Sequence, residues 1–180
     1  MIPRSNHFNL GQDTTRIKDP NDARRQERTT EAILGRFFNP SAKNRFEIQV
    51  LADEVGMGKT FVALATAYSI LAAMRKGRQE ADLQGCYQKV LVLTPPNSAL
   101  FNKWNREVDE FVRRCVLPEY RKNADWFAPE RIERIDDLVA AVRKSGKRQV
   151  LVASMGILSG GKLLNYDLKR RFTLGVLFRY

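Results

Sequence analysis

The chain has 180 residues, a length typical of one domain, and 43% of them are hydrophobic. It can therefore bury a core, which excludes a wholly disordered chain. Its formal net charge of +11 favours an acidic partner: nucleic acid is the first candidate, and a membrane surface or an acidic protein is an alternative. A plainer interpretation also stays open, in which the charge only keeps the protein soluble.

The positive charge is concentrated near the end of the sequence. Residues 141–180 contain nine Lys or Arg residues and one acid, Asp167, so they contribute +8 of the net +11. Such an asymmetry favours a phosphate-facing surface over uniform solubilisation.

The cysteines and the N-terminal sequence bear on location. Cys86 and Cys115 lack the spacing of zinc ligands or a redox pair, and the single histidine, His7, cannot complete a metal cluster with them. We therefore expect reduced thiols in a cytoplasmic protein. Residues 1–22 form a polar N-terminal segment without a secretory signal, expected to be loosely ordered. The longest apolar run, residues 61–74, is too short to span a bilayer, so no membrane partner is expected.

Helices and strands are predicted to alternate along the chain. Apolar residues at helical spacing predict helices at residues 23–38, 59–76, 98–114 and 130–144. Short apolar or β-branched runs predict strands at residues 46–51, 90–93 and 150–153. Irregular structure is expected at 75–88 and 117–129, and the state of 165–180 stays open. This alternation predicts an α/β fold, a parallel sheet with flanking helices and right-handed crossovers.

Chemistry is expected where the strands end. In parallel sheets, ligands bind at the carboxyl ends of the strands. A glycine-rich loop, the pair Thr94-Pro95 and Ser154 each follow a predicted strand. These residues are therefore expected along one edge of the sheet.

The glycine-rich loop, residues 53–60, reads Asp-Glu-Val-Gly-Met-Gly-Lys-Thr. Its glycines permit a tight turn that aims backbone N–H groups at phosphate oxygens, and the following helix adds its positive N-terminal end. Lys59 is expected to reach the β- and γ-phosphates of ATP, and the Thr60 hydroxyl to hold Mg²⁺. The strict phosphate-loop pattern has glycine where Asp53 stands. The dinucleotide-binding pattern fails at Phe61, and an incidental glycine-rich turn is the plain alternative.

This loop resembles the first motif of superfamily-two helicases, in particular the Swi/Snf-type translocase ATPases, whose loop reads Asp-Glu-x-Gly-x-Gly-Lys-Thr. All six specified residues match. The resemblance implies a RecA-like phosphate-loop NTPase in which Lys59 stabilises the transferred phosphoryl group. It also implies that Gln26, upstream, reads adenine, although a solvated glutamine is the plain alternative. The ATP site would comprise Gln26, Asp53, Glu54, Val55, Gly56, Met57, Gly58, Lys59 and Thr60.

Two later segments extend the resemblance. Residues 90–95, followed by Trp104 and Glu107, resemble the family's next motif, which grips the nucleic-acid backbone. Residues 150–154 resemble a third motif on the same track. Trp104 is equally readable as a core residue, and the basic residues of the intervening helix as a solvated face. The expected nucleic-acid contacts are Pro95, Lys103, Lys147, Arg148 and Ser154.

One family motif has no counterpart. The resemblance calls for an acidic motif, Asp-Glu-x-His or similar, whose Asp holds Mg²⁺ through water and whose Glu polarises the attacking water. After Ser154 the only acid is Asp167, and Asp109-Glu110 lies inside a predicted helix. Residues 23–180 would then be a partial RecA-like helicase domain 1, and the missing C-terminal RecA-like domain would belong to the same longer chain. A degenerate relative that binds nucleotide without hydrolysis is the alternative.

The resulting expectation is the ATP-binding front half of a DNA-dependent translocase or helicase-like ATPase, inactive as this chain alone. Two alternatives stay open. One is a phosphate-loop NTPase or kinase without a nucleic-acid role. The other is a non-catalytic module that docks through its basic end and has no nucleotide affinity.

Overall fold

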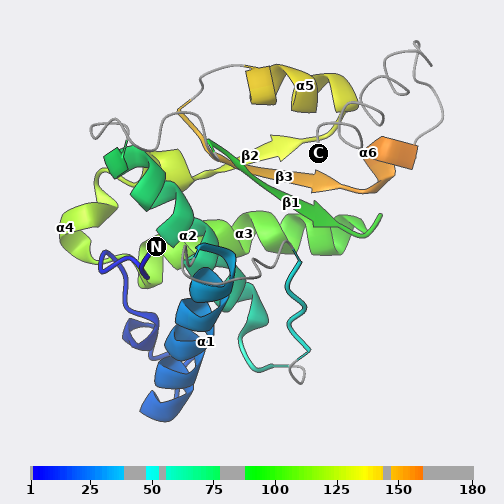
Figure 1. Ribbon diagram of the computed structural model, residues 1–180. Coiled ribbons are helices and arrows are strands. Elements are labelled where there is room, and N and C mark those ends of the chain that lie inside the picture. Colours follow the sequence, from blue (N-terminus) through cyan, green and yellow to red (C-terminus); the bar gives the residue numbers. More distant parts are fainter. Residues whose placement is uncertain (1, 39–47, 53–55, 78–87, 144–146, 160–180) are drawn as a thin grey trace.

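The computed structural model describes residues 2–38, 48–52, 56–77, 88–143 and 147–159 (Figure 1). They form a mixed α/β structure with a small sheet and flanking helices. The strands are β1 (Val90–Thr94), β2 (Pro129–Ile132) and β3 (Val150–Ser154). The longer helices are α1 (Pro20–Phe38), α2 (Lys59–Gly77), α3 (Ser98–Arg114) and α5 (Ile135–Arg143). Short turns of helix are η1 (Leu10–Gln12), α4 (Pro118–Arg121), η3 (Asp125–Phe127) and α6 (Gly156–Ser159).

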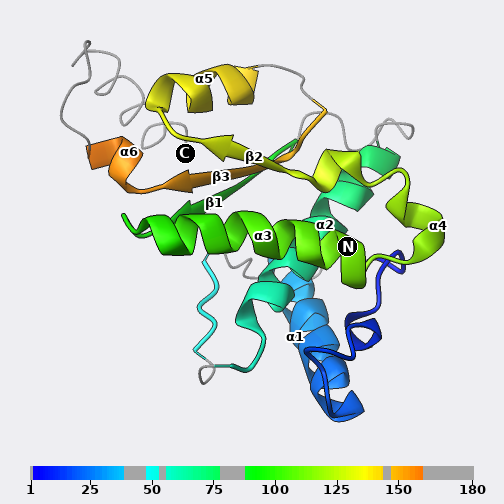
Figure 2. The same ribbon diagram turned by 180° about the vertical axis from the view of Figure 1, so that it is seen from behind.

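The sheet is all parallel, with strand order β1-β3-β2, as the alternating pattern predicted. The helices α3 and α5 cover opposite faces (Figures 1 and 2). Alternate residues of β3 show this: Val152 packs in the cluster of Phe111 from α3, whereas Leu151 packs with Leu138 from α5. Because right-handed crossovers running in opposite directions place their helices on opposite faces, this is the arrangement that such crossovers produce.

The main core is aromatic and lies between α2, α3 and the sheet. Tyr68 on α2 contacts Phe111 on α3 and Trp126 and Phe127 before β2, with ring centroids 4.9–5.8 Å apart. Burial raises the pKa of Tyr68 to about 12. A separate apolar contact between α1 and α2 includes Leu34 and Met74. The first helix is therefore fixed to the helix that follows the glycine loop.

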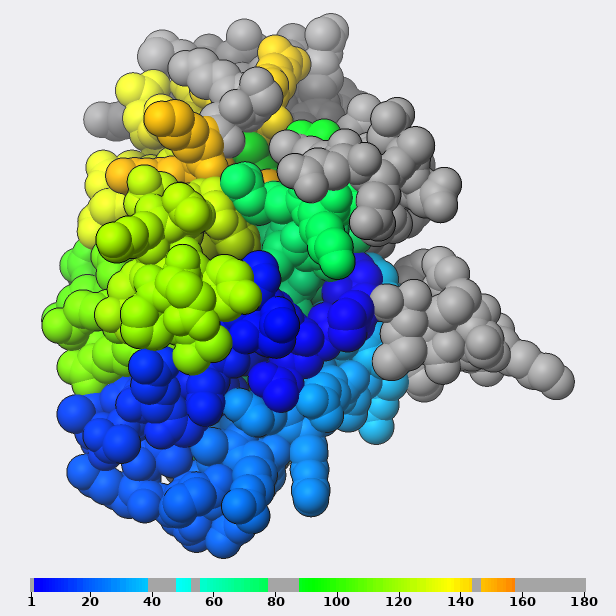
Figure 3. All heavy atoms as spheres, turned by 90° about the vertical axis from the view of Figure 1, so that its left-hand side faces the viewer, coloured from blue at the N-terminus to red at the C-terminus, as the bar shows by residue number. Residues whose placement is uncertain are grey.

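The N-terminal segment is packed rather than loosely ordered, so that expectation is wrong for residues 2–18. Phe8 and Leu10 are buried in the main core, and Ile17 is also buried. Phe8 pairs as an antiparallel bridge with Val116 just after α3. Figure 3 shows the dark-blue segment lying between α1 and the yellow-green region of α4. Its few apolar residues fill the core, which an overall polar composition concealed.

Two predicted elements differ from the structure. The described part of the predicted strand 46–51, residues 48–51, forms no strand, and Ile48 and Val50 are 81% and 73% exposed. Within the described chain these residues have no neighbouring strand, and the Gln49 side chain instead accepts a hydrogen bond from Arg36. The predicted helix 130–144 begins only at Ile135, because the residues before it pair with β3 as β2.

The other predicted helices and strands are confirmed to within a few residues. Residues 160–180, and with them most of the basic C-terminal stretch, lie outside the described residues. Within the described chain, no helix has the length and apolar character needed to cross a bilayer.

Candidate nucleotide site

The second half of the glycine loop turns directly into a helix. Gly56 and Gly58 have φ angles of +89° and +82°, a left-handed conformation that glycine adopts without steric penalty. The helix α2 begins at Lys59, and the Gly58 carbonyl accepts from the N–H groups of Phe61 and Val62 at 2.9 and 3.1 Å. The first N–H groups of a helix have no acceptor within it, so this turn presents donors and a positive helix end.

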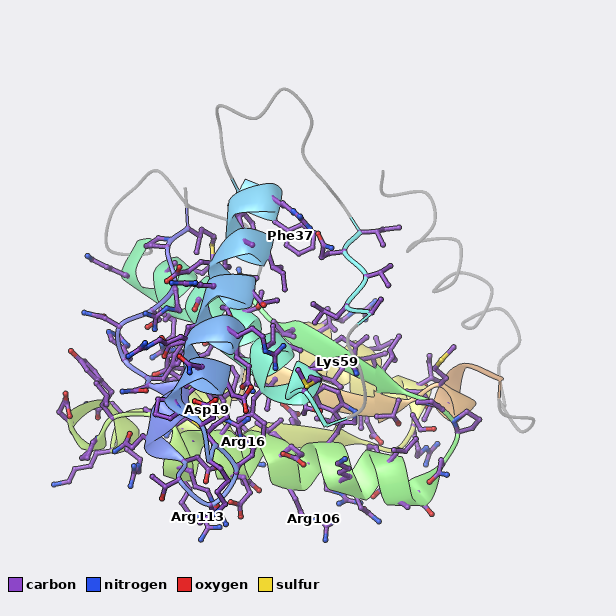
Figure 4. The ribbon with its side chains drawn as sticks, turned by 90° about the horizontal axis from the view of Figure 1, so that it is seen from below. Arg16, Asp19, Phe37, Lys59, Arg106 and Arg113 are labelled. Carbon is purple, nitrogen blue, oxygen red and sulfur yellow. The ribbon has the colours of Figure 1, made fainter. Side chains whose placement is uncertain are left out.

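Lys59 and Thr60 occupy the first turn of α2, each half-buried. Figure 4 shows Lys59 at the start of this helix, close to the sheet. The three preceding loop residues, Asp53, Glu54 and Val55, lie outside the described residues. The described part of the loop thus fits the phosphates of a nucleotide in three ways: a left-handed glycine turn, a helix N-terminus and a lysine.

The helix α1 holds this loop from one side. Arg25 donates from Nη2 to the carbonyl of Met57 at 2.9 Å. Gln26, the next residue, is only 2% exposed and lies against Gly58, where a Cβ would come within 2.6 Å of its Cδ. The solvated alternative for Gln26 is therefore wrong. Its side chain supports the loop, and this contact explains why position 58 requires glycine.

Arg16 fixes Gln26 in turn. Its Nη1 donates to Gln26 Oε1 at 3.1 Å, and its guanidinium lies 3.7 Å from the centroid of the Phe61 ring. Arg16 also pairs with Asp13, with Nε and Oδ2 3.5 Å apart. Asp13 pairs with Arg114 on α3 at 3.3 Å. Polar side chains therefore connect Arg114 on α3 through Asp13 and Arg16 to Gln26, which lies against the glycine loop. Figure 4 labels Arg16.

The electrostatics of this chain depend on Asp13, a buried carboxylate that is 4% exposed. Burial alone would raise its pKa, but hydrogen bonds from Thr15 and Arg114 and the charges of Arg114 and Arg16 outweigh burial. The pKa of Asp13 consequently lies below its usual value, and the carboxylate stays ionised at neutral pH.

A pocket of about 420 Å³ opens beside this chain, between the first turn of α2 and α3. Phe61 lines it from α2, and Lys103, Arg106 and Glu110 line it from α3. Glu110 forms ion pairs with Arg113 and Arg114. Lys103, one of the predicted nucleic-acid contacts, thus lines the pocket that Phe61 lines from α2.

The remaining predicted nucleic-acid contacts separate into two groups. Pro95 and Ser154 lie together at the carboxyl edge, where Ser154 Oγ donates to the Pro95 carbonyl at 3.5 Å. Lys147 and Arg148 precede β3 and lie at the opposite edge, where Arg148 donates to the carbonyl of Pro129 at 3.0 Å. Arg148 and Ser154 are six positions apart along an extended chain, a distance of about 20 Å. The five predicted residues therefore do not form one surface.

Metal and thiol chemistry receive little support from the described residues. In this part of the chain, no three His, Cys, Asp or Glu side chains cluster as metal ligands. Cys115 is a free, buried cysteine, and burial raises the pKa of its thiol to about 12. It stays protonated and unreactive at neutral pH, whereas Cys86 lies outside the described residues.

Comparisons with protein-family models, with curated proteins and with solved structures gave no match to this chain. Its function therefore has to be argued from the site. Sequence patterns missed two residues of that site, Arg16 and Arg25. Arg25 adjoins Gln26 and carried a positional signal, whereas Arg16 reaches Gln26 only because the N-terminal segment folds back onto α3.

Proposed function

We propose that residues 56–60, supported by Arg25 and Gln26, bind the phosphates of Mg-ATP in the front half of a nucleic-acid-dependent translocase or helicase-like ATPase. One observation supports this most: two glycines with positive φ lead directly into a long helix that begins Lys-Thr. This arrangement supplies a turn of N–H donors, a helix end and the positive charge of a lysine in one place.

Each residue has a distinct part in the proposed site. The N–H groups around Gly56 and Gly58 would receive phosphate oxygens, and Lys59 would stabilise charge on the β- and γ-phosphates. The Thr60 hydroxyl would hold Mg²⁺, which neutralises phosphate charge when bound. Gln26 would contribute indirectly by supporting the loop, since its side chain already contacts Arg16 and Gly58.

The nucleic-acid part of the proposal rests on the parallel sheet and its carboxyl edge. An all-parallel sheet flanked by helices is compatible with a RecA-like arrangement. Pro95 and Ser154 follow adjacent paired strands and are joined by a hydrogen bond. Open α/β sheets bind ligands at this edge, and polar groups gather there in this protein.

Replacing Lys59 tests the nucleotide site. We expect Lys59→Ala to weaken Mg-ATP binding by about 1.5–3 kcal/mol, because one charge-assisted contact to phosphate is lost. Isothermal titration calorimetry of both proteins measures the difference. Lys76→Ala, at the other end of α2, is the matched control and should bind as the wild type does.

Equal affinities of Lys59→Ala and wild type would remove Lys59 from the site. Circular dichroism of both variants establishes that the fold survives. If Mg-ATP binds but no DNA binds with or without it, the result favours the alternative of a phosphate-loop NTPase without a nucleic-acid role.

A further inference from the structure

One face of α1 is a stripe of arginines that the nucleotide site does not account for. Residues 21, 24, 25, 28, 29, 32, 33 and 36 recur at helical spacing, and all line a groove of about 580 Å³. Four of them are arginines: Arg24, Arg25, Arg28 and Arg36. From Arg24 to Arg36 the stripe extends about 18 Å along the helix.

The opposite wall of this groove is residues 49–52, the segment that leads into the glycine loop. Arg36 fixes it by donating to Gln49 Oε1 at 3.0 Å. The lining also includes the apolar side chains of Ile33, Val50 and Leu51, of which Val50 is largely exposed. Among the described residues, the lining includes no acidic side chain.

Two of these arginines are not engaged by other groups of the described structure. Among the described residues, Arg24 and Arg28 form no ion pair or hydrogen bond, and both are exposed. Of the acids of the same helix, Asp22 pairs with Arg25, with Nε and Oδ1 3.9 Å apart, and Glu27 and Glu31 pair with Arg4. Arg24 and Arg28 lie one helical turn apart without a described counter-charge and repel each other, and an anion in the groove relieves that repulsion.

We propose that this α1 groove binds the sugar-phosphate backbone of single-stranded nucleic acid. Guanidinium groups pair with phosphates in a bidentate manner, and their planes also stack on unpaired bases. Exposed aliphatic side chains beside them give such bases an apolar surface to cover. A duplex keeps its bases stacked inside, so they cannot contact the apolar side chains of the groove.

The inference rests on the proposed function for its choice of ligand, since an acidic peptide also offers anions. It adds a second surface, distinct from Pro95 and Ser154 and from the pair Lys147 and Arg148. Because Arg25 lies in this groove and also donates to the Met57 carbonyl, a bound strand would contact the element that holds the glycine loop.

Fluorescence anisotropy with a labelled oligothymidylate of about 20 nucleotides tests the proposal on the full chain. The double variant Arg24→Glu/Arg28→Glu should lose at least about tenfold in affinity. Its salt dependence should flatten by about 1.4 logarithmic units, at about 0.7 per lost phosphate contact. The matched control, Lys76→Glu/Lys122→Glu, makes the same change of charge at exposed positions of α2 and after α4.

Equal losses in the two double variants would overturn the proposal, because net charge alone would then explain them. Three further outcomes would also overturn it. If a blunt-ended duplex binds as tightly as the single strand, the apolar residues of the groove do not contact unpaired bases. Displacement by poly-glutamate at lower concentration than by the oligonucleotide would identify an acidic-protein surface. Displacement by Mg-ATP would identify the groove as part of the nucleotide site.

The proposed nucleotide site and the groove proposal can be tested independently of each other. Arg24→Glu/Arg28→Glu should bind Mg-ATP as the wild type does in calorimetry, whereas Lys59→Ala should bind the oligonucleotide normally. If the wild-type protein binds the oligonucleotide but not Mg-ATP, the proposed nucleotide site is refuted and the groove proposal stands.

Discussion

Gly58 is the residue on which the loop geometry depends most. Its φ angle is +82°, and an added Cβ would lie 2.6 Å from Gln26 Cδ, whereas Gly56, at +89°, has nothing within 4 Å of such a Cβ. Gly56→Ala should therefore lose only the backbone preference, about 1–2 kcal/mol. Gly58→Ala should lose a further 1–3 kcal/mol or so by overpacking. Urea unfolding of the two variants measures the difference.

Removing Gln26 isolates that second effect. In a Gln26→Ala background, Gly58→Ala should be no more destabilising than Gly56→Ala, because the side chain that it meets is gone. The double-mutant cycle then gives a coupling above about 0.5 kcal/mol. Additive effects would show that Gln26 does not fill the space over the loop.

Asp13 makes the stability of the protein sensitive to acid. Its pKa in the folded protein is lowered by Thr15, Arg114 and Arg16 against the opposing effect of burial, so below about pH 4 the unfolded chain binds the proton more readily. The stabilisation is complete above the unfolded pKa and is lost as the pH falls through the folded pKa. Urea midpoints between about pH 2 and pH 6 should fall more steeply for wild type than for Asp13→Asn. Parallel curves would contradict this role.

At the scale of elements, the N-terminal segment is expected to contribute to the stability of the whole domain. Leu10 in η1 is completely buried, so Leu10→Ala should destabilise the protein by about 2–5 kcal/mol. Asn6→Ala, at an exposed position of the same segment, is the control and should change stability by less than about 0.5 kcal/mol. Thermal unfolding compares them, and similar midpoints for both would mean that the segment does not pack in solution.

Elements with local signals were predictable from the sequence. The helix α3 has its predicted bounds because its apolar stripe is continuous and because Asn97 caps it, accepting from the N–H groups of Ala99 and Leu100. Strands depend on distant partners instead. The run 48–51 is apolar but has no partner strand among the described residues, whereas residues 129–132 pair with β3 despite a helical pattern. Local periodicity contains no information about such pairing.

The site shows the same division. The glycines, Lys59 and Thr60 follow from a short motif whose physical requirements are local. The support from Arg16 does not, because it requires the chain from residue 13 to 16 to reach both α1 and Arg114 on α3. No spacing in the sequence indicates that contact, so only the folded structure connects α3 with the nucleotide loop.

At the scale of the molecule, the positive charge is distributed over separate surfaces. Arg148 lies at the amino edge of the sheet, Lys103 in the pocket beside Phe61, and Arg24 and Arg28 on the outer face of α1. A nucleic acid that contacted all of them would have to pass around the domain. The net charge of +11 therefore favours association in general, while the geometry of each surface determines what it binds.

The whole chain should bind Mg-ATP without turning it over. Hydrolysis needs a carboxylate free to orient the attacking water, and losing a general base lowers the rate by about 10²–10⁴-fold. Of the three acids on α3, Glu110 is paired with Arg113 and Arg114, and Asp109 faces a different groove, beside β2. Glu107 lines the pocket beside Phe61 together with Lys103 and Arg106, in the middle of the helix rather than at the end of a strand. In a phosphate-release assay with oligothymidylate, wild type should release no more phosphate than Lys59→Ala. Multiple turnovers that require Lys59 would refute this, and Glu107→Gln, Glu110→Gln and Asp109→Asn would then show which carboxylate serves as the base.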